Sequence, residues 1–115
     1  MKRTRLRRIS ERRLRETELY RYRVRQFLLA HPYCQVWLAE HGVVEAEAIR
    51  VGGTITLADC SVVLVPLATE VHHRNKRRGD DLLDARFWLA VSREAHRQIE
   101  ERKQAARAAG YLLNF

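Results

Sequence analysis

The stretch that decides the fold runs from residue 70 to residue 96 and reads EVHHRNKRRGDDLLDARFWLAVSREAH. It begins with two adjacent histidines, His72 and His73, which must point to opposite faces if they lie on a strand. A basic run with a glycine follows, and a third histidine, His96, comes later on a segment with helical spacing. Neutral imidazole is the commonest metal ligand in proteins. One histidine of the pair can therefore bind a cation together with His96 while its neighbour takes a proton from water.

Apolar residues from position 81 onward recur at helical spacing, although residues 88–92 (WLAVS) also fit a short strand or a turn. Gly110 predicts the end of the last helix. The apolar positions with this spacing are Leu83, Phe87, Trp88, Val91, Ala95 and Ile99. We expect Leu83, Phe87 and Trp88 to lie in the core.

The middle of the chain, residues 43–71, is rich in Val, Ile and Thr and predicts extended structure with a turn at Gly52–Gly53. Pro66 confines one strand to an edge or an end of a sheet. Cys60 lies in this apolar region, so we expect it to be buried. Residues 31–42 (HPYCQVWLAEHG) predict a compact turn or a short helix stopped by the glycine.

The N-terminal segment predicts a helix over residues 11–31 with Ser10 as its N-cap. Pro32 ends this helix, because the residue before a proline is pushed out of the α region. The first half is mainly arginine, and we expect it to project from the body. The second half has an apolar face made of Tyr20, Val24, Phe27, Leu28 and His31.

The net charge of +8 comes entirely from the N-terminal segment. Residues 1–25 hold 11 basic and 3 acidic side chains, and the other 90 residues hold 11 of each. Arginine forks bind phosphate bidentately and release counterions, so a polyanion partner fits this arm. A solvated basic helix and a contact with an acidic protein are the alternatives. A membrane surface fits less well, because the arm lacks a broad apolar face.

Length and cysteine usage narrow the class of protein. At 115 residues the chain is one domain by size, without an apolar run of membrane-span length or a secretory signal. Cys34 and Cys60 form neither a metal-ligand doublet nor a disulfide framework. We therefore expect free thiols, no membrane association and a cytoplasmic location.

Residues 70–112 resemble the HNH endonucleases, particularly the small phage-type members, and HPYC with the basic helix before it is also similar. The shared order is a histidine doublet, a basic loop with glycine, LLD, an aromatic-rich stretch and a histidine that opens the last helix. The resemblance implies an α+β fold with a ββα-metal core, in which a hairpin and a helix hold one divalent cation. It also implies a basic helical arm over residues 1–31 and an HNH-like domain over residues 32–115 with a C-terminal helix. Residues 43–69 are then an extra β-rich insert.

By resemblance, His72 and His96 are metal ligands and His73, expected to be exposed, is the general base. The hydroxide formed at His73 attacks phosphorus, the bond to the 3′ oxygen breaks, and the metal stabilises the developing charge and this leaving oxygen. The cation can be Mg, Mn, Ni or Zn, which the sequence does not distinguish. The residues predicted to contact DNA are Arg3, Arg5, Arg7, Arg8, Arg12, Arg13, Arg74, Lys76, Arg77 and Arg78.

The sequence departs from the family pattern in two places. The place of the family's middle asparagine falls on Phe87, and Asp84, three residues earlier, is the candidate to stabilise the loop instead. Many relatives bind a structural zinc through two cysteine pairs. The corresponding positions are Cys34, Trp37, Ser92 and Ala95, and Cys34 is the single thiol among them. We therefore predict that the chain binds no structural zinc. We expect Trp37 to pack near Ser92 and Ala95 in place of the zinc.

The function that this sequence predicts is a metal-dependent endonuclease that nicks or cuts double-stranded DNA in a bacterial or phage-infected cell. Two alternatives stay open. One is a DNA-binding protein whose catalytic centre has decayed. The other is an accessory protein, such as a phage packaging component, that binds an acidic partner. His31 and His41 are expected to be structural or solvent-facing and to have no partners.

Overall fold

The computed structural model describes residues 11–75 and 83–113 of the chain. These residues form an α+β structure, in agreement with the α+β part of the predicted fold, with β1 paired to β2 and β3 paired to β4. The elements in chain order are α1 (Glu11–Ala30), α2 (Gln35–Glu40), α3 (Glu45–Arg50), β1 (Thr54–Thr56), β2 (Val62–Leu64), β3 (Glu70–His73), the short 3-10 helix η2 (Ala85–Phe87), β4 (Trp88–Val91), α4 (Arg93–Glu101) and α5 (Lys103–Ala108).

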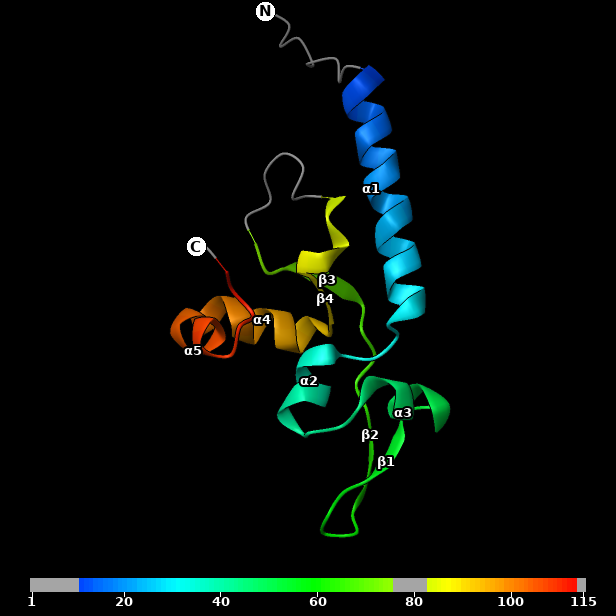
Figure 1. Cartoon of the computed structure of the whole chain (residues 1–115), viewed down its shortest axis with the longest axis vertical. Helices are drawn as coiled ribbons and strands as arrows, with labels where there is room; N and C mark the ends of the chain where they lie inside the picture. Colours follow the sequence, from blue (N-terminus) through cyan, green and yellow to red (C-terminus); the bar gives the residue numbers. More distant parts are fainter. Residues whose placement is uncertain (1–10, 76–82, 114–115) are drawn as a thin grey trace, which may run out of the picture.

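The first helix, α1, ends at Ala30, just before Pro32, as predicted. Its first turns stand clear of the body, and its later turns run beside the β3–β4 hairpin (Figure 1). The predicted apolar positions Tyr20, Val24 and Phe27 are half-buried, whereas the arginines between them are exposed. The predicted cap Ser10 lies outside the described residues.

The hairpin of β3 and β4 is antiparallel, with His72 opposite Leu89 and His73 opposite Trp88. Of the helix, strand and turn that residues 88–92 could form, the strand is adopted over residues 88–91, because these residues complete the hydrogen-bonded ladder with β3. Ser92 then caps α4, and its hydroxyl accepts from the amide of Ala95 at 3.1 Å. The helix α4 contacts both strands, so the unit is two strands followed by a helix packed on them.

The segment between residues 43 and 69 is less β-rich than predicted, because it opens with α3. Its EAEAIR sequence combines strong helix formers with a glutamate in the first turn. Gly52 and Gly53 have φ of +69° and +82° and make the predicted turn into β1. The expected burial of Cys60 is wrong: it is exposed at φ +67° in the turn between β1 and β2.

Two hydrophobic clusters hold these elements together, and half-buried Trp37 packs against both. Trp88 is buried as predicted, but Leu83 and Phe87 are only half-buried. The last helix is interrupted at Arg102, and Gly110 at φ +83° follows α5. One cluster is Cys34, Val36, Val91, Ala95, Ile99, Ala106 and Leu112, and the other is Leu38, Ala48, Ile55 and Val65.

Candidate metal and nucleic-acid site

The strand β3 separates two groups of side chains, because successive residues of a strand point to opposite faces. Glu70 and His72 face α4, where both contact His96. His73 faces α1, where it contacts Tyr20. The adjacent histidines therefore lie on opposite faces, as the sequence predicted.

The face against α4 brings three potential metal ligands together: His72 from β3 and His96 and Glu100 from α4. One ligand atom of each residue lies within 4.8 Å of the others. The ring centroids of His72 and His96 are 5.3 Å apart, so the predicted pair is brought together. Glu100 was not predicted. Its signal in the sequence was the spacing of four residues after His96, which puts both side chains on one face of a helix.

Each histidine of this cluster makes a hydrogen bond through one ring nitrogen. His72 Nε2 lies 2.7 Å from the carbonyl oxygen of Tyr111, in the turn after α5. His96 Nδ1 lies 2.7 Å from a carboxylate oxygen of Glu70. Such outer partners fix the orientation of metal-ligating histidines and are a regular part of metal sites.

Burial lowers the pKa of His72 below its ordinary value, because its side chain is only 3% exposed. The bond to the Tyr111 carbonyl and the charge of Glu100 act in the opposite direction, while His96 and Arg74 lower the pKa further. His72 is therefore neutral at neutral pH, which is the form that can bind a metal ion.

His73 is 8% exposed, so the expectation that it is exposed is wrong. The hydroxyl of Tyr20 lies 3.2 Å from its Nε2, and the two rings are stacked with centroids 5.8 Å apart. Trp88 meets the edge of the same imidazole at 5.8 Å. The residue predicted as general base thus packs between α1 and β4, on the face of β3 away from the ligand cluster. The sequence did not reveal Tyr20 as its partner.

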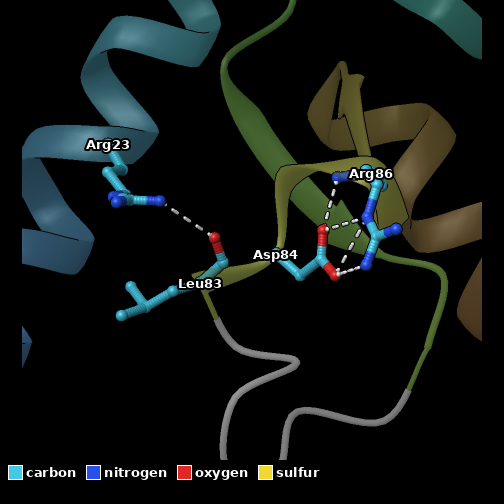
Figure 2. A network of polar contacts seen from close by, with 4 residues as sticks. All are labelled: Arg23, Leu83, Asp84 and Arg86. Carbon is cyan, nitrogen blue, oxygen red and sulfur yellow. Dashed lines mark hydrogen bonds and ion pairs between the residues drawn. The ribbon is translucent and has the colours of Figure 1, made fainter.

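Asp84 accepts from the amide of Arg86 at 3.1 Å and forms an ion pair with the Arg86 guanidinium (Figure 2). This hydrogen-bonded guanidinium lowers the pKa of the Asp84 carboxyl. Beside it, Arg23 of α1 donates to the carbonyl of Leu83 at 3.4 Å, which ties α1 to the turn before β4 (Figure 2). Residues 76–82 lie outside the described residues, so the stabilisation of that loop by Asp84 stays a prediction.

Phe87 stands where the resemblance to HNH endonucleases would place an asparagine. There the main chain closes the hairpin, because the amide of Arg74 donates to the carbonyl of Phe87 at 2.7 Å. The Arg74 side chain donates in turn to the carbonyl of Gly110 at 2.9 Å and is half-buried. Arg74 therefore fixes the C-terminal turn, a role that the sequence did not predict. Its predicted contact with DNA stays a prediction.

Two other predicted DNA-binding residues are described, Arg12 and Arg13, and both are exposed on α1. Arg12 makes an ion pair with Glu16 one turn later at 3.1 Å, an arrangement that leaves its side chain 86% exposed. The remaining ones lie outside the described residues: Arg3, Arg5, Arg7, Arg8, Lys76, Arg77 and Arg78.

The expectation that His31 and His41 have no partners is wrong. His31 Nδ1 lies 2.8 Å from a carboxylate oxygen of Glu45, and His41 stacks on Trp37 with centroids 3.9 Å apart. These contacts join α1 to α3 and close the end of α2. Both histidines are structural, as expected, and neither belongs to the ligand cluster.

Cys34, Trp37, Ser92 and Ala95, the four positions compared with zinc cysteines in the sequence analysis, line one cavity of about 270 Å³. Trp37 thus lies near Ser92 and Ala95, as predicted, whereas the replacement of a zinc by packing stays a prediction. Cys34, the thiol among the four, is fully buried in the core. The lack of a structural zinc stays a prediction.

Two imidazoles and a carboxylate are a donor set that suits Zn, Mn or Ni. These three residues thus fit a divalent cation, with Glu70 and the Tyr111 carbonyl as outer partners.

Among the described residues, no helix is both long and apolar enough to cross a membrane. Comparisons of the chain with protein-family models, curated proteins and solved structures found no match.

Proposed function

We propose that this chain is a divalent-metal-dependent DNA endonuclease with a ββα-metal core formed by β3, β4 and α4. The observation that carries the proposal is the ligand cluster: His72, His96 and Glu100 converge from a strand and from the helix after the hairpin. A bound cation supplies Lewis acidity to a phosphate oxygen. His72, His96 and Glu100 hold it, and the neutral state of His72 keeps a lone pair available.

The basic arm supports DNA as the substrate. The charge excess of the chain lies within residues 1–25, and the described part of this arm is an exposed helix. Arg12 and Arg13 lie on it with exposed side chains. Such a helix binds phosphates without reading base sequence, so its contribution to affinity falls steeply with salt.

In this proposal His73 is the proton acceptor, and the Tyr20 hydroxyl must leave its Nε2 before the nitrogen can take a proton from water. Since α1 carries both Tyr20 and the arginines, engagement of DNA by α1 is the event that moves the Tyr20 hydroxyl away from Nε2 of His73.

A second function, DNA binding without hydrolysis, is favoured by one observation. His73 lies on the opposite face of β3 from the cluster, packed between Tyr20 and Trp88. A base held there is separated from water beside the cation by the strand itself. The chain would then use the cluster for a metal and α1 for DNA.

The test combines titration calorimetry with Mn²⁺ or Ni²⁺ and nicking of supercoiled plasmid in Mg²⁺, Mn²⁺, Ni²⁺ or EDTA. We expect His96→Ala to lose both metal binding and nicking. His73→Ala should keep the metal and lose about 10²–10⁴-fold in rate, as expected for a general base. His41→Ala is the matched control, because His41 is an exposed histidine outside the cluster. A parent protein that binds DNA and metal yet never nicks would contradict the endonuclease and support the second function.

A further inference from the structure

The two histidines of the ligand cluster are held by acceptors on different ring nitrogens. His72 uses Nε2 toward the carbonyl oxygen of Tyr111, and His96 uses Nδ1 toward the carboxylate of Glu70, both at 2.7 Å. A carbonyl oxygen and an ionised carboxylate only accept hydrogen bonds. The nitrogen that faces each of them must therefore carry the hydrogen.

A neutral imidazole has one N–H and one lone pair. The bond to Tyr111 places the hydrogen of His72 on Nε2 and leaves the lone pair on Nδ1. The bond to Glu70 places the hydrogen of His96 on Nδ1 and leaves the lone pair on Nε2. The two rings are thus fixed in opposite tautomers while their centroids lie 5.3 Å apart.

Other contacts of the main chain hold both acceptors in place. Glu70 comes two residues before His72 on β3, so both residues share the face that packs on α4. The Tyr111 turn is joined to the end of the same strand, because Arg74 donates to the carbonyl of Gly110 and accepts from the amide of Leu113. The amide of Tyr111 itself donates to Ala106 of α5.

We propose that Glu70 and the Tyr111 carbonyl are positioning groups that set opposite tautomers in His72 and His96, so that one lone pair of each ring is ready for a cation. This inference rests on the proposed function, which supplies the cation. It adds Glu70 and Tyr111, which are not among the residues proposed to hold that cation. Glu70 acts through His96 and makes no contact with the cation. The C-terminal turn becomes part of the site through its main chain.

The first measurement needs no metal. A long-range proton–nitrogen correlation spectrum of the isotope-labelled full chain at mildly alkaline pH reports the tautomer of each histidine. We expect Nε2–H for His72 and Nδ1–H for His96. Glu70→Ala should let His96 exchange between both tautomers, whereas Glu70→Gln should keep Nδ1–H, because the amide oxygen still accepts. A parent spectrum with Nε2–H at His96 would overturn the inference.

The second measurement is calorimetric affinity for Mn²⁺ or Ni²⁺. We expect Glu70→Ala to weaken it about 10–100-fold, the usual range for an outer partner of a metal ligand, and Glu70→Gln to restore most of the loss. Glu45→Ala is the matched control, because Glu45 makes the same kind of bond to Nδ1 of His31 at 2.8 Å, outside the cluster. It should shift the His31 tautomer toward Nε2–H, because the side-chain amide of Gln35, 3.3 Å from the same Nδ1, can then donate to it, and it should leave metal affinity unchanged.

The outcomes separate the two proposals. If the parent binds no divalent cation, the proposed function fails, and the tautomers alone decide the inference. If the parent binds a cation but Glu70→Ala weakens binding no more than Glu45→Ala does, Glu70 is merely structural and the inference is wrong.

Discussion

The two faces of β3 hold their histidines in different ways. Against α4, His72 lies among polar groups that offer lone pairs and a carboxylate within 4.8 Å. Against α1, His73 lies between the rings of Tyr20 and Trp88. His72 and His73 are neighbours in sequence, yet one lies among polar groups and the other between aromatic rings. Their side chains point to opposite faces of the strand, so each meets a different helix. Metal affinity should depend on one face, and the docking of α1 on the other.

The largest expected effect is on the α1 face. Trp88 is 4% exposed and contacts Tyr20, Phe27 and His73 edge-on. We expect Trp88→Ala to lower the free energy of unfolding by about 3–5 kcal/mol, measured by denaturant titration, because it leaves a large cavity.

Trp88→Phe tests the same face in a protein that stays folded. The indole Nε1 is buried and has no hydrogen-bond partner among the described residues, so this change removes packing alone. Metal affinity should stay at the parental value. If it falls together with stability, the two faces are coupled and the comparison fails.

The next effect concerns DNA on the α1 side. If Arg12 and Arg13 each neutralise one phosphate, replacing both with Gln should reduce the slope of log K against log salt by about 1.8, at about 0.9 per contact. Duplex binding measured by fluorescence anisotropy over a salt series checks this. Arg50→Gln, an exposed arginine on α3, is the control and should keep the parental slope. Equal slopes for both variants would place the DNA surface elsewhere.

A smaller effect is expected from Tyr20→Phe, which keeps the ring and removes the hydroxyl near His73 Nε2. The loss of one hydrogen bond should lower stability by about 0.5–1.5 kcal/mol. Nicking should become faster, because the Tyr20 hydroxyl then no longer lies against Nε2 of His73 and α1 need not move. Tyr22→Phe, two residues away and 58% exposed, is the control. Indistinguishable nicking rates for the two variants would show that the hydroxyl does not hold His73 back.

The smallest effect is a pH dependence that belongs to the α4 face. The pKa of His72 in the folded protein is below 6.5, so between the two values the unfolded chain binds more protons. Stability of the metal-free protein should therefore fall as pH drops through about 6.5 toward the folded-state value. The charged groups facing His72 are His96, Glu100 and Arg74.

Denaturant titrations at several pH values measure this dependence. His72→Gln should make this pH dependence shallower, because it removes the group that takes up the proton on unfolding. An unchanged pH slope in His72→Gln would assign the effect to another group.

The sequence by itself determined the features that depend on neighbouring residues. Pro32 ends α1 because a proline pushes the residue before it out of the α region. Gly42 and Gly110 follow helix ends because glycine readily adopts positive φ, here +64° and +83°. The opposite orientation of His72 and His73 follows from strand alternation, and the pairing of His72 with His96 was predicted from the order of the motif. The concentration of charge in the N-terminal arm is likewise a property of composition.

Only the tertiary structure decided which side chains meet across the chain. Tyr20 reaches His73 over 53 residues, Tyr111 reaches His72 over 39, and Glu70 reaches His96 over 26. These contacts depend on how α1, α4 and the C-terminal turn dock on the hairpin, which local periodicity does not specify. Residues 88–91 show the same principle, because hydrogen bonding to β3 overrides their helical spacing and makes them a strand. The environment of each histidine is therefore set by long-range packing, and its face by local alternation.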